Sequence, residues 1–229
     1  MFEGEFSRLR CGAWQTPFPL QTNWEDGAKR NVSKCPLCSN NGTLEHILNF
    51  CTVALNQGRL TWRHNSVLQF LAQSFISKKP SELEVYADLD GLHLNGSTIP
   101  PDIVPTQQRP DLVIINRKEK LVFIIELTIC FERNFEAANA RKAERYQHLK
   151  NDIEDRGFKC YLLPLEIGSR GYVSKKNKMC IINTLKMNNI PLPFSEIIKH
   201  CSKISLLCSY SIFNAYNQPT WSDPPLLMP

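Results

Sequence analysis

RPDLVIINRKEKLVFIIELTIC, at residues 109–130, is the stretch that decides the fold. Two apolar, β-branched runs flank the charged tetrapeptide RKEK, and this pattern predicts a β-hairpin. With the turn centred on Lys118 and Glu119, antiparallel pairing places Asp111 directly opposite Glu126. Directly opposed residues share a face of the sheet, with Cβ atoms roughly 4.5–5.5 Å apart. Two carboxylates at that distance repel each other unless a cation lies between them, so the pair predicts a divalent-cation site. The alternative is a pair of surface acids at strand ends.

A helix is predicted to follow the hairpin over about residues 132–157, with Gly157 as its stop signal. One lysine, Lys142, falls in the middle of its apolar stripe, where a buried ammonium without a partner would be costly. We therefore expect Lys142 to point at the sheet that carries the two carboxylates; the alternative is a lysine reaching past the packed face into solvent. At spacings of three and four, the stripe consists of Phe135, Ala138, Lys142, Tyr146, Leu149 and Ile153.

Three cysteines and a histidine in residues 35–51 have the spacing C-x2-C-x7-H-x4-C. Three thiolates and one imidazole complete a tetrahedral zinc site that has no open position for chemistry. Thr43 is expected to cap a short helix that carries the histidine. The alternative is four unrelated residues in a chain with nine cysteines, an odd number that indicates a reducing compartment. The predicted zinc ligands are Cys35, Cys38, His46 and Cys51.

The composition favours a protein that binds nucleic acid. The 229 residues carry a net charge of +5 with 42% hydrophobic residues, and no apolar run approaches the ~20 residues that span a membrane. Seven Lys or Arg against one acid fall between Lys29 and Lys79, which predicts a basic module suited to a phosphate backbone. An ordinary solvated basic surface is the alternative.

Further elements follow from periodicity and capping signals. A helix from Gly58 to about Lys79 carries His64 on its apolar face, where a packing role is the first expectation. A first strand is expected at 83–89, followed by a loop at 90–108 that leads to the hairpin, and a fourth strand is expected at 161–167. Ser195 is expected to cap a final amphipathic helix.

The order PD, E, K on strand, strand and helix resembles the PD-(D/E)XK nuclease superfamily. The usual lysine stands two residues after the glutamate, where this chain has Thr128, so Lys142 would be a relocated lysine. That relocation resembles the restriction-like endonuclease at the C-terminus of certain non-LTR retrotransposon proteins. The likeness extends over residues 9–175 through RPDLVI, ELT, ANARKAERYQHL, RGFKCYLLPLEIGSRGY, CPLCSNNGTLEHIL and RLTWRHNSVL.

The resemblance implies an α/β fold: a restriction-endonuclease-like mixed sheet flanked by helices, with a small N-terminal zinc knuckle. The expected division is an irregular or linker segment at 1–30, the knuckle and following helix at 31–80, and the endonuclease domain at 81–229. In that family a reverse transcriptase precedes the endonuclease, and its catalytic turn has the sequence aromatic-x-Asp-Asp. Residues 86–90 resemble this sequence, but Leu89 separates the two aspartates. The chain is therefore expected to be a free-standing piece of such an element.

The implied activity is metal-dependent cleavage of DNA, with Mg²⁺ or Mn²⁺ on Asp111, Glu126 and the carbonyl oxygen of Leu127. Lys142 would orient or deprotonate the attacking water, helped by a hydrogen bond from Tyr146.

Phosphate contacts complete the implied site. Arg109 would contact the phosphate or steady Asp111. The implied partner is DNA in the nucleus, with the element's RNA as a further candidate and without a membrane. The alternative from another class is a nuclease-inactive nucleic-acid-binding remnant. Nucleic acid would be contacted by Arg59, Arg63, His64, Arg145 and Arg170.

Overall fold

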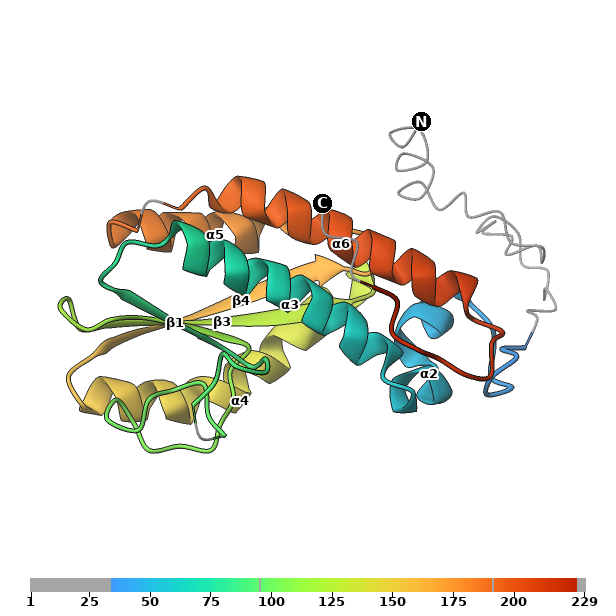
Figure 1. The fold of residues 1–229 in the computed structure, drawn as a ribbon, viewed down its shortest axis with the longest axis horizontal. Coiled ribbons are helices and arrows are strands. Elements are labelled where there is room, and N and C mark those ends of the chain that lie inside the picture. Colours follow the sequence, from blue (N-terminus) through green and yellow to red (C-terminus); the bar gives the residue numbers. More distant parts are fainter. Residues whose placement is uncertain (1–33, 95, 191, 226–229) are drawn as a thin grey trace.

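The computed structural model describes residues 34–94, 96–190 and 192–225 (Figure 1). The segment 1–30, expected to be irregular, lies outside these residues, as do Lys29 and Arg30 of the expected basic module. The described chain has a mixed α/β fold around one four-stranded sheet with the order β1-β2-β3-β4. The strands are β1 (Leu83–Ala87), β2 (Leu112–Asn116), β3 (Leu121–Cys130) and β4 (Lys159–Gly168).

The β2–β3 hairpin has the predicted midpoint. Leu112 pairs with Ile125 and Asn116 with Leu121, so the register extended by one residue sets Asp111 against Glu126. The β1–β2 and β2–β3 pairs are antiparallel, whereas β3 and β4 run parallel and are joined by the crossover helix α4 (Phe135–Asp155). A short 3-10 turn, η2 (Glu132–Asn134), precedes α4. The predicted stop is present, because Gly157 has φ +83° just beyond the helix.

Helices cover both faces of the sheet (Figure 1). On one face lie α3 (Arg59–Lys78), α5 (Lys175–Met187) and α6 (Phe194–Asn214), which share an apolar core with Ile114 and Phe123. On the other face α4 packs against alternate residues such as Val113 and Ile124. Both central strands are therefore buried on both sides, which explains their continuous apolar runs.

Before α3 come two short elements, η1 (His46–Phe50) and α2 (Thr52–Asn56). Ile47 and Leu48 of η1 belong to the same apolar core as α3, α6 and the sheet. The segment 46–78 therefore packs directly on the rest of the fold.

Several boundaries differ from the sequence expectation. β1 ends at Ala87, because the chain turns there and the Leu89 amide donates to the Ala87 carbonyl at 2.8 Å. α6 begins at Phe194 after Pro193, so Ser195 lies in its first turn and does not cap it. The helix α5 has no counterpart in the sequence prediction. None of the described helices is long and apolar enough to cross a membrane.

Candidate functional site

Asp111 and Glu126 meet where β2 begins. The Asp111 amide donates to Glu126 Oε1 at 3.0 Å, which fixes the glutamate side chain against the backbone of the opposite strand. The two side chains are only 13% and 7% exposed. Glu126 follows Val122 and Ile124 on the sheet face that α4 covers, so both acids are largely withdrawn from water.

Lys142 reaches these acids from the middle of α4. Its Nζ lies 2.8 Å from Asp111 Oδ2, 2.9 Å from Glu126 Oε2 and 2.5 Å from the carbonyl oxygen of Leu127. The inward orientation predicted from the helical stripe is therefore present. The three oxygen atoms that hold the ammonium belong to the residues expected from sequence to hold a divalent metal.

The charges of this cluster shift one another's pKa. Burial would raise the pKa of Asp111, but the neighbouring His64 and the charge of Lys142 outweigh it and lower the pKa to about 2. Burial and the charge of Asp111 raise the pKa of Glu126 to about 7. For Lys142, burial favours the neutral form, but the two carboxylates prevail and raise its pKa. The ammonium is thus the internal counter-charge of the pair.

His64 joins the cluster from α3, on the far side of the sheet. Its Nε2 is 3.6 Å from Asp111 Oδ1 and 3.3 Å from the Leu127 carbonyl oxygen, while Nδ1 lies 3.1 Å from Asn65 Oδ1. Burial lowers the pKa of His64, but its contact with Asp111 dominates and raises it. The sequence placed His64 on the packed face of its helix but gave no sign of its contact with Asp111.

Tyr146 and Arg109 are beside the cluster but do not make the contacts expected of them. The Tyr146 hydroxyl donates to the carbonyl oxygen of Arg109 at 3.4 Å, whereas Lys142 is bound by the acids. The Arg109 guanidinium forms an ion pair with Asp88, which follows β1 and donates its amide to the Asp111 carbonyl at 3.0 Å. The acid that pairs with the Arg109 guanidinium is therefore Asp88 and not Asp111. Through this pair Arg109 stabilises the ends of the strands.

Two arginines expected to contact nucleic acid are buried. Arg59 donates to the carbonyl oxygens of Ala215 and Gln218 at 2.6 and 2.7 Å and lies over the ring of Trp221. Arg63 donates to Ser209 Oγ at 2.8 Å and is 1% exposed. The prediction fails for both, because the C-terminal segment and α6 cover these guanidinium groups.

The other two arginines differ from each other. Arg145 is exposed on α4, with its guanidinium 5.2 Å from the centroid of the Tyr146 ring. Arg170 is partly buried, pairs with Glu132 at 3.0 Å and lies 4.7 Å from the centroid of the Phe131 ring. Its charge is largely compensated within the protein.

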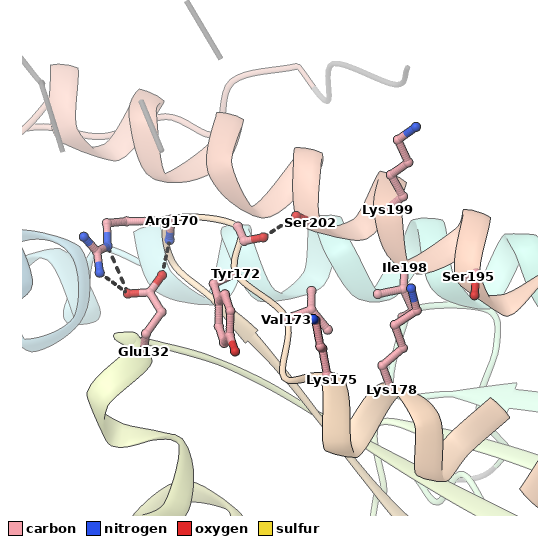
Figure 2. A pocket seen from close by; sticks show the side chains of 11 residues that line it. Glu132, Arg170, Tyr172, Val173, Lys175, Lys178, Ser195, Ile198, Lys199 and Ser202 are labelled. Atoms are coloured by element: carbon pink, nitrogen blue, oxygen red, sulfur yellow. Dashed lines mark hydrogen bonds and ion pairs between the residues drawn. The ribbon is translucent and has the colours of Figure 1, made fainter. Parts of the chain in front are cut away.

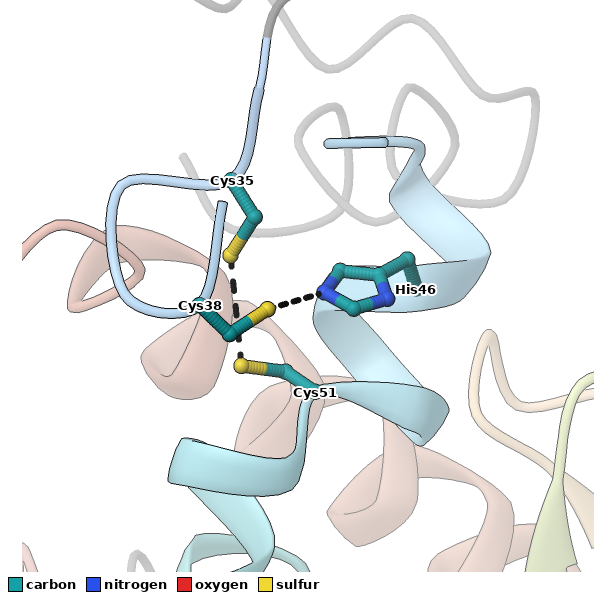
Figure 3. Close-up of side chains that lie close together, drawn as sticks. All are labelled: Cys35, Cys38, His46 and Cys51. Carbon is teal, nitrogen blue, oxygen red and sulfur yellow. Dashed lines mark hydrogen bonds between the residues drawn. The ribbon is translucent and has the colours of Figure 1, made fainter. Parts of the chain in front are cut away.

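The predicted zinc ligands form a cluster in the structure (Figure 3). One ligand atom from each of the four residues lies within 4.8 Å of the others, an arrangement that could hold a metal ion such as zinc. Cys35 Sγ is 3.9 Å from Cys51 Sγ, and Cys38 Sγ is 3.1 Å from His46 Nε2. Thr43 accepts a hydrogen bond from the His46 amide at 3.1 Å, as expected of a cap.

Burial shifts the pKa of both His46 and Cys51 in this cluster. Burial lowers the pKa of His46, which favours the neutral imidazole that ligates metals. Burial and the charge of Cys35 raise the pKa of Cys51 to about 11. A metal would relieve this repulsion by binding the thiolates, with release of protons.

Glu166 on β4 is a buried acid that the sequence reasoning did not single out. It is 1% exposed and accepts a hydrogen bond from Asn177 of α5. Burial raises its pKa, and the charge of Lys142 opposes that rise. Its position in the apolar-looking run YLLPLEI could have marked it, because an acid inside a buried strand needs a partner.

The chain was also compared with known proteins. It matches no protein-family model, and a search of curated proteins returned no match.

Proposed function

We propose that this protein is a metal-dependent DNA endonuclease with a restriction-like core, built around Asp111, Glu126 and Lys142. The observation that carries the proposal is the convergence of Asp111 Oδ2, Glu126 Oε2 and the Leu127 carbonyl oxygen on one cation, the Lys142 ammonium. Two largely buried acids and one inward lysine on strand, strand and helix are the arrangement that the PD-(D/E)XK resemblance implies.

The donor set fits Mg²⁺ or Mn²⁺. Carboxylate and carbonyl oxygens are the ligands that these hard cations prefer, and here they already face a common point. A divalent ion bound there supplies charge stabilisation at a phosphate and lowers the pKa of a bound water. Because a second cation at this point would repel the ammonium, the same oxygens cannot hold Lys142 closely at the same time.

Each protein residue then has a distinct task. Asp111 and Glu126 would hold the metal, and the Asp111 amide keeps the Glu126 carboxylate in place. Lys142 would then lie beside the reacting phosphate, where it would orient the water and donate to developing negative charge. His64 positions Asp111 from the opposite side.

DNA is the partner that the remaining surface suits. Arg145, one turn beyond Lys142 and exposed on α4, offers a guanidinium for the phosphate backbone. The Cys/His cluster, as a closed zinc site, would hold the segment before α3 in shape.

Cleavage of supercoiled plasmid by purified protein tests the proposal. We expect nicked or linear product with Mg²⁺ or Mn²⁺ and none without a divalent ion. Glu126→Gln should abolish cleavage, whereas Glu119→Gln, at an exposed acid of the hairpin turn, should retain it. Cleavage by Glu126→Gln at the wild-type rate would contradict the proposal.

A further inference from the structure

A cavity of about 610 Å³ lies beyond the carboxyl ends of β3 and β4, between the loop after β4 and the helices α5 and α6 (Figure 2). Glu132, Arg170, Tyr172 and Ser202 are among its lining residues. None of the residues assigned above to metal binding or cleavage lines it. What the cavity could bind is therefore a separate question from cleavage.

The cavity is positively charged. Lys175 and Lys178 on α5 and Lys199 on α6 line it, and none of the three takes part in an ion pair within the described part of the chain. Its single acid, Glu132, is already paired with Arg170 at 3.0 Å. Lys175 and Lys178 extend toward the cavity, whereas Lys199 lines its rim and its side chain ends away from Tyr172 (Figure 2). Three lysines without an ion pair at one cavity favour an anionic ligand with more than one charge.

The wall of the cavity is held in place by the fold. Ser205 Oγ donates to the Gly168 carbonyl at 2.9 Å, and Ser202 Oγ donates to the Gly171 carbonyl. Gly171 has φ +80°, and a Cβ there would lie 2.9 Å from the Ser202 carbonyl oxygen, so only glycine allows this close approach. The loop between β4 and α5 is thus fastened to α6, and the site is preformed.

Tyr172 adds an aromatic surface beside the lysines. Its side chain lies among the lining residues of the cavity (Figure 2) and is 56% exposed. Its ring stacks on that of Phe135, with centroids 5.9 Å apart. An exposed ring supported from behind can stack on a nucleobase, and lysines beside it can follow the phosphates. In a duplex the base faces are already stacked on one another, so such a ring selects an unpaired base.

We propose that this cavity binds a single-stranded segment of nucleic acid, with phosphates on Lys175, Lys178 and Lys199 and a base on Tyr172. The choice of ligand rests on the proposed function, because it takes nucleic acid as the substrate class. Glu126 precedes Glu132 by six residues, which places the cavity within about 20 Å of the cleavage cluster. One strand of roughly six nucleotides could span that distance.

Fluorescence anisotropy with zinc-replete protein and no added Mg²⁺ or Mn²⁺ tests the site independently of cleavage. The probes are a 20-mer of deoxythymidine and a duplex of equal length, each titrated over a range of salt. The variant Lys175→Ala/Lys178→Ala/Lys199→Ala should bind the single strand at least tenfold more weakly. The slope of log affinity against log salt should fall by about 2, since each single-strand phosphate contact contributes about 0.7.

The matched control removes the same charge elsewhere. Lys118→Ala/Lys176→Ala/Lys186→Ala changes three exposed lysines that do not line the cavity, one of them in the hairpin turn and two on α5. It should alter single-strand affinity less than threefold, roughly as expected for non-specific surface charge. Tyr172→Ala should weaken binding by about 5- to 100-fold and Tyr172→Phe should restore it, as expected for base stacking.

The proposal would be overturned if the two triple variants lost single-strand affinity equally. It would also be overturned if the cavity variant lost affinity equally for the duplex and for the single strand. A 20-residue polyglutamate that binds as tightly as the oligonucleotide, and is also lost in the cavity variant, would reassign the site to acidic peptides. If single-strand binding depends on the cavity but no cleavage occurs, the endonuclease proposal fails and this one stands. If the wild-type protein cuts plasmid while the cavity variant binds the single strand normally, the endonuclease proposal stands and the cavity proposal fails.

Discussion

At the scale of single residues, Lys142 holds the charge balance of the candidate site. Its ammonium is bound by two largely buried carboxylates that otherwise face each other across a β-hairpin. A buried ion triad is sensitive to the loss of one member, because the remaining charges lose their compensation. The same sensitivity makes substitutions at this position informative about chemistry.

Lys142→Ala is expected to lower the single-turnover cleavage rate by roughly 10²–10⁴-fold, the usual range for a positioned proton-transfer group. Lys142→Arg should restore little, because a guanidinium is wider and does not readily give up a proton. DNA affinity, measured separately, should change only slightly. Cleavage by Lys142→Ala at the wild-type rate would remove the lysine from the mechanism.

At the scale of elements, local patterns predicted most of what forms the site. The hairpin midpoint and the α4 stripe depend only on neighbours in sequence, and the structure brings Asp111, Glu126 and Lys142 together as both patterns predict. The helix α5 was missed because its only buried residues are Ile181 and Leu185, too few to give a clear apolar period.

The Cys/His cluster yields a prediction about the elements η1 and α2. Purified protein should contain one zinc ion per chain by elemental analysis, and Cys51→Ser should lose it. Loss of zinc should increase amide hydrogen exchange at residues 35–51, while Phe123 and Ile124 of β3 stay protected because they lie in the sheet.

Cys180→Ser is the matched control, because this exposed thiol on α5 lies outside the cluster. It should keep the full zinc content. Protein without zinc, and with unchanged exchange after chelation, would show that the cluster is not a metal site.

At the scale of the whole molecule, the start of α3 is fastened to the C-terminal segment. The contacts of Arg59 with Ala215 and Gln218 join residues 156 and 159 positions apart in sequence. A local sequence pattern cannot reveal a partner so far away in the chain. For this reason, sequence alone assigned Arg59 and Arg63 to nucleic-acid binding.

Arg59→Met is expected to lower the free energy of unfolding by about 1–3 kcal/mol, since it leaves the buried carbonyl group of Ala215 without a donor. Urea denaturation measures this change. Arg145→Ala, at an exposed arginine of α4, should alter stability by less than about 0.5 kcal/mol but weaken DNA binding. Reversed effects of the two substitutions would contradict the assignment of Arg59 to structure and Arg145 to DNA.

The central claim is that the oxygens now holding the Lys142 ammonium form a divalent-metal site, and electron paramagnetic resonance of Mn²⁺ tests it most directly. Zinc-loaded wild-type protein should bind one Mn²⁺, and Asp111→Asn should bind it at least tenfold more weakly. Lys142→Met should bind Mn²⁺ more tightly, by on the order of tenfold, because no ammonium competes for the oxygens. Absence of Mn²⁺ binding at millimolar concentration, or equal binding by wild type and Asp111→Asn, would contradict the account.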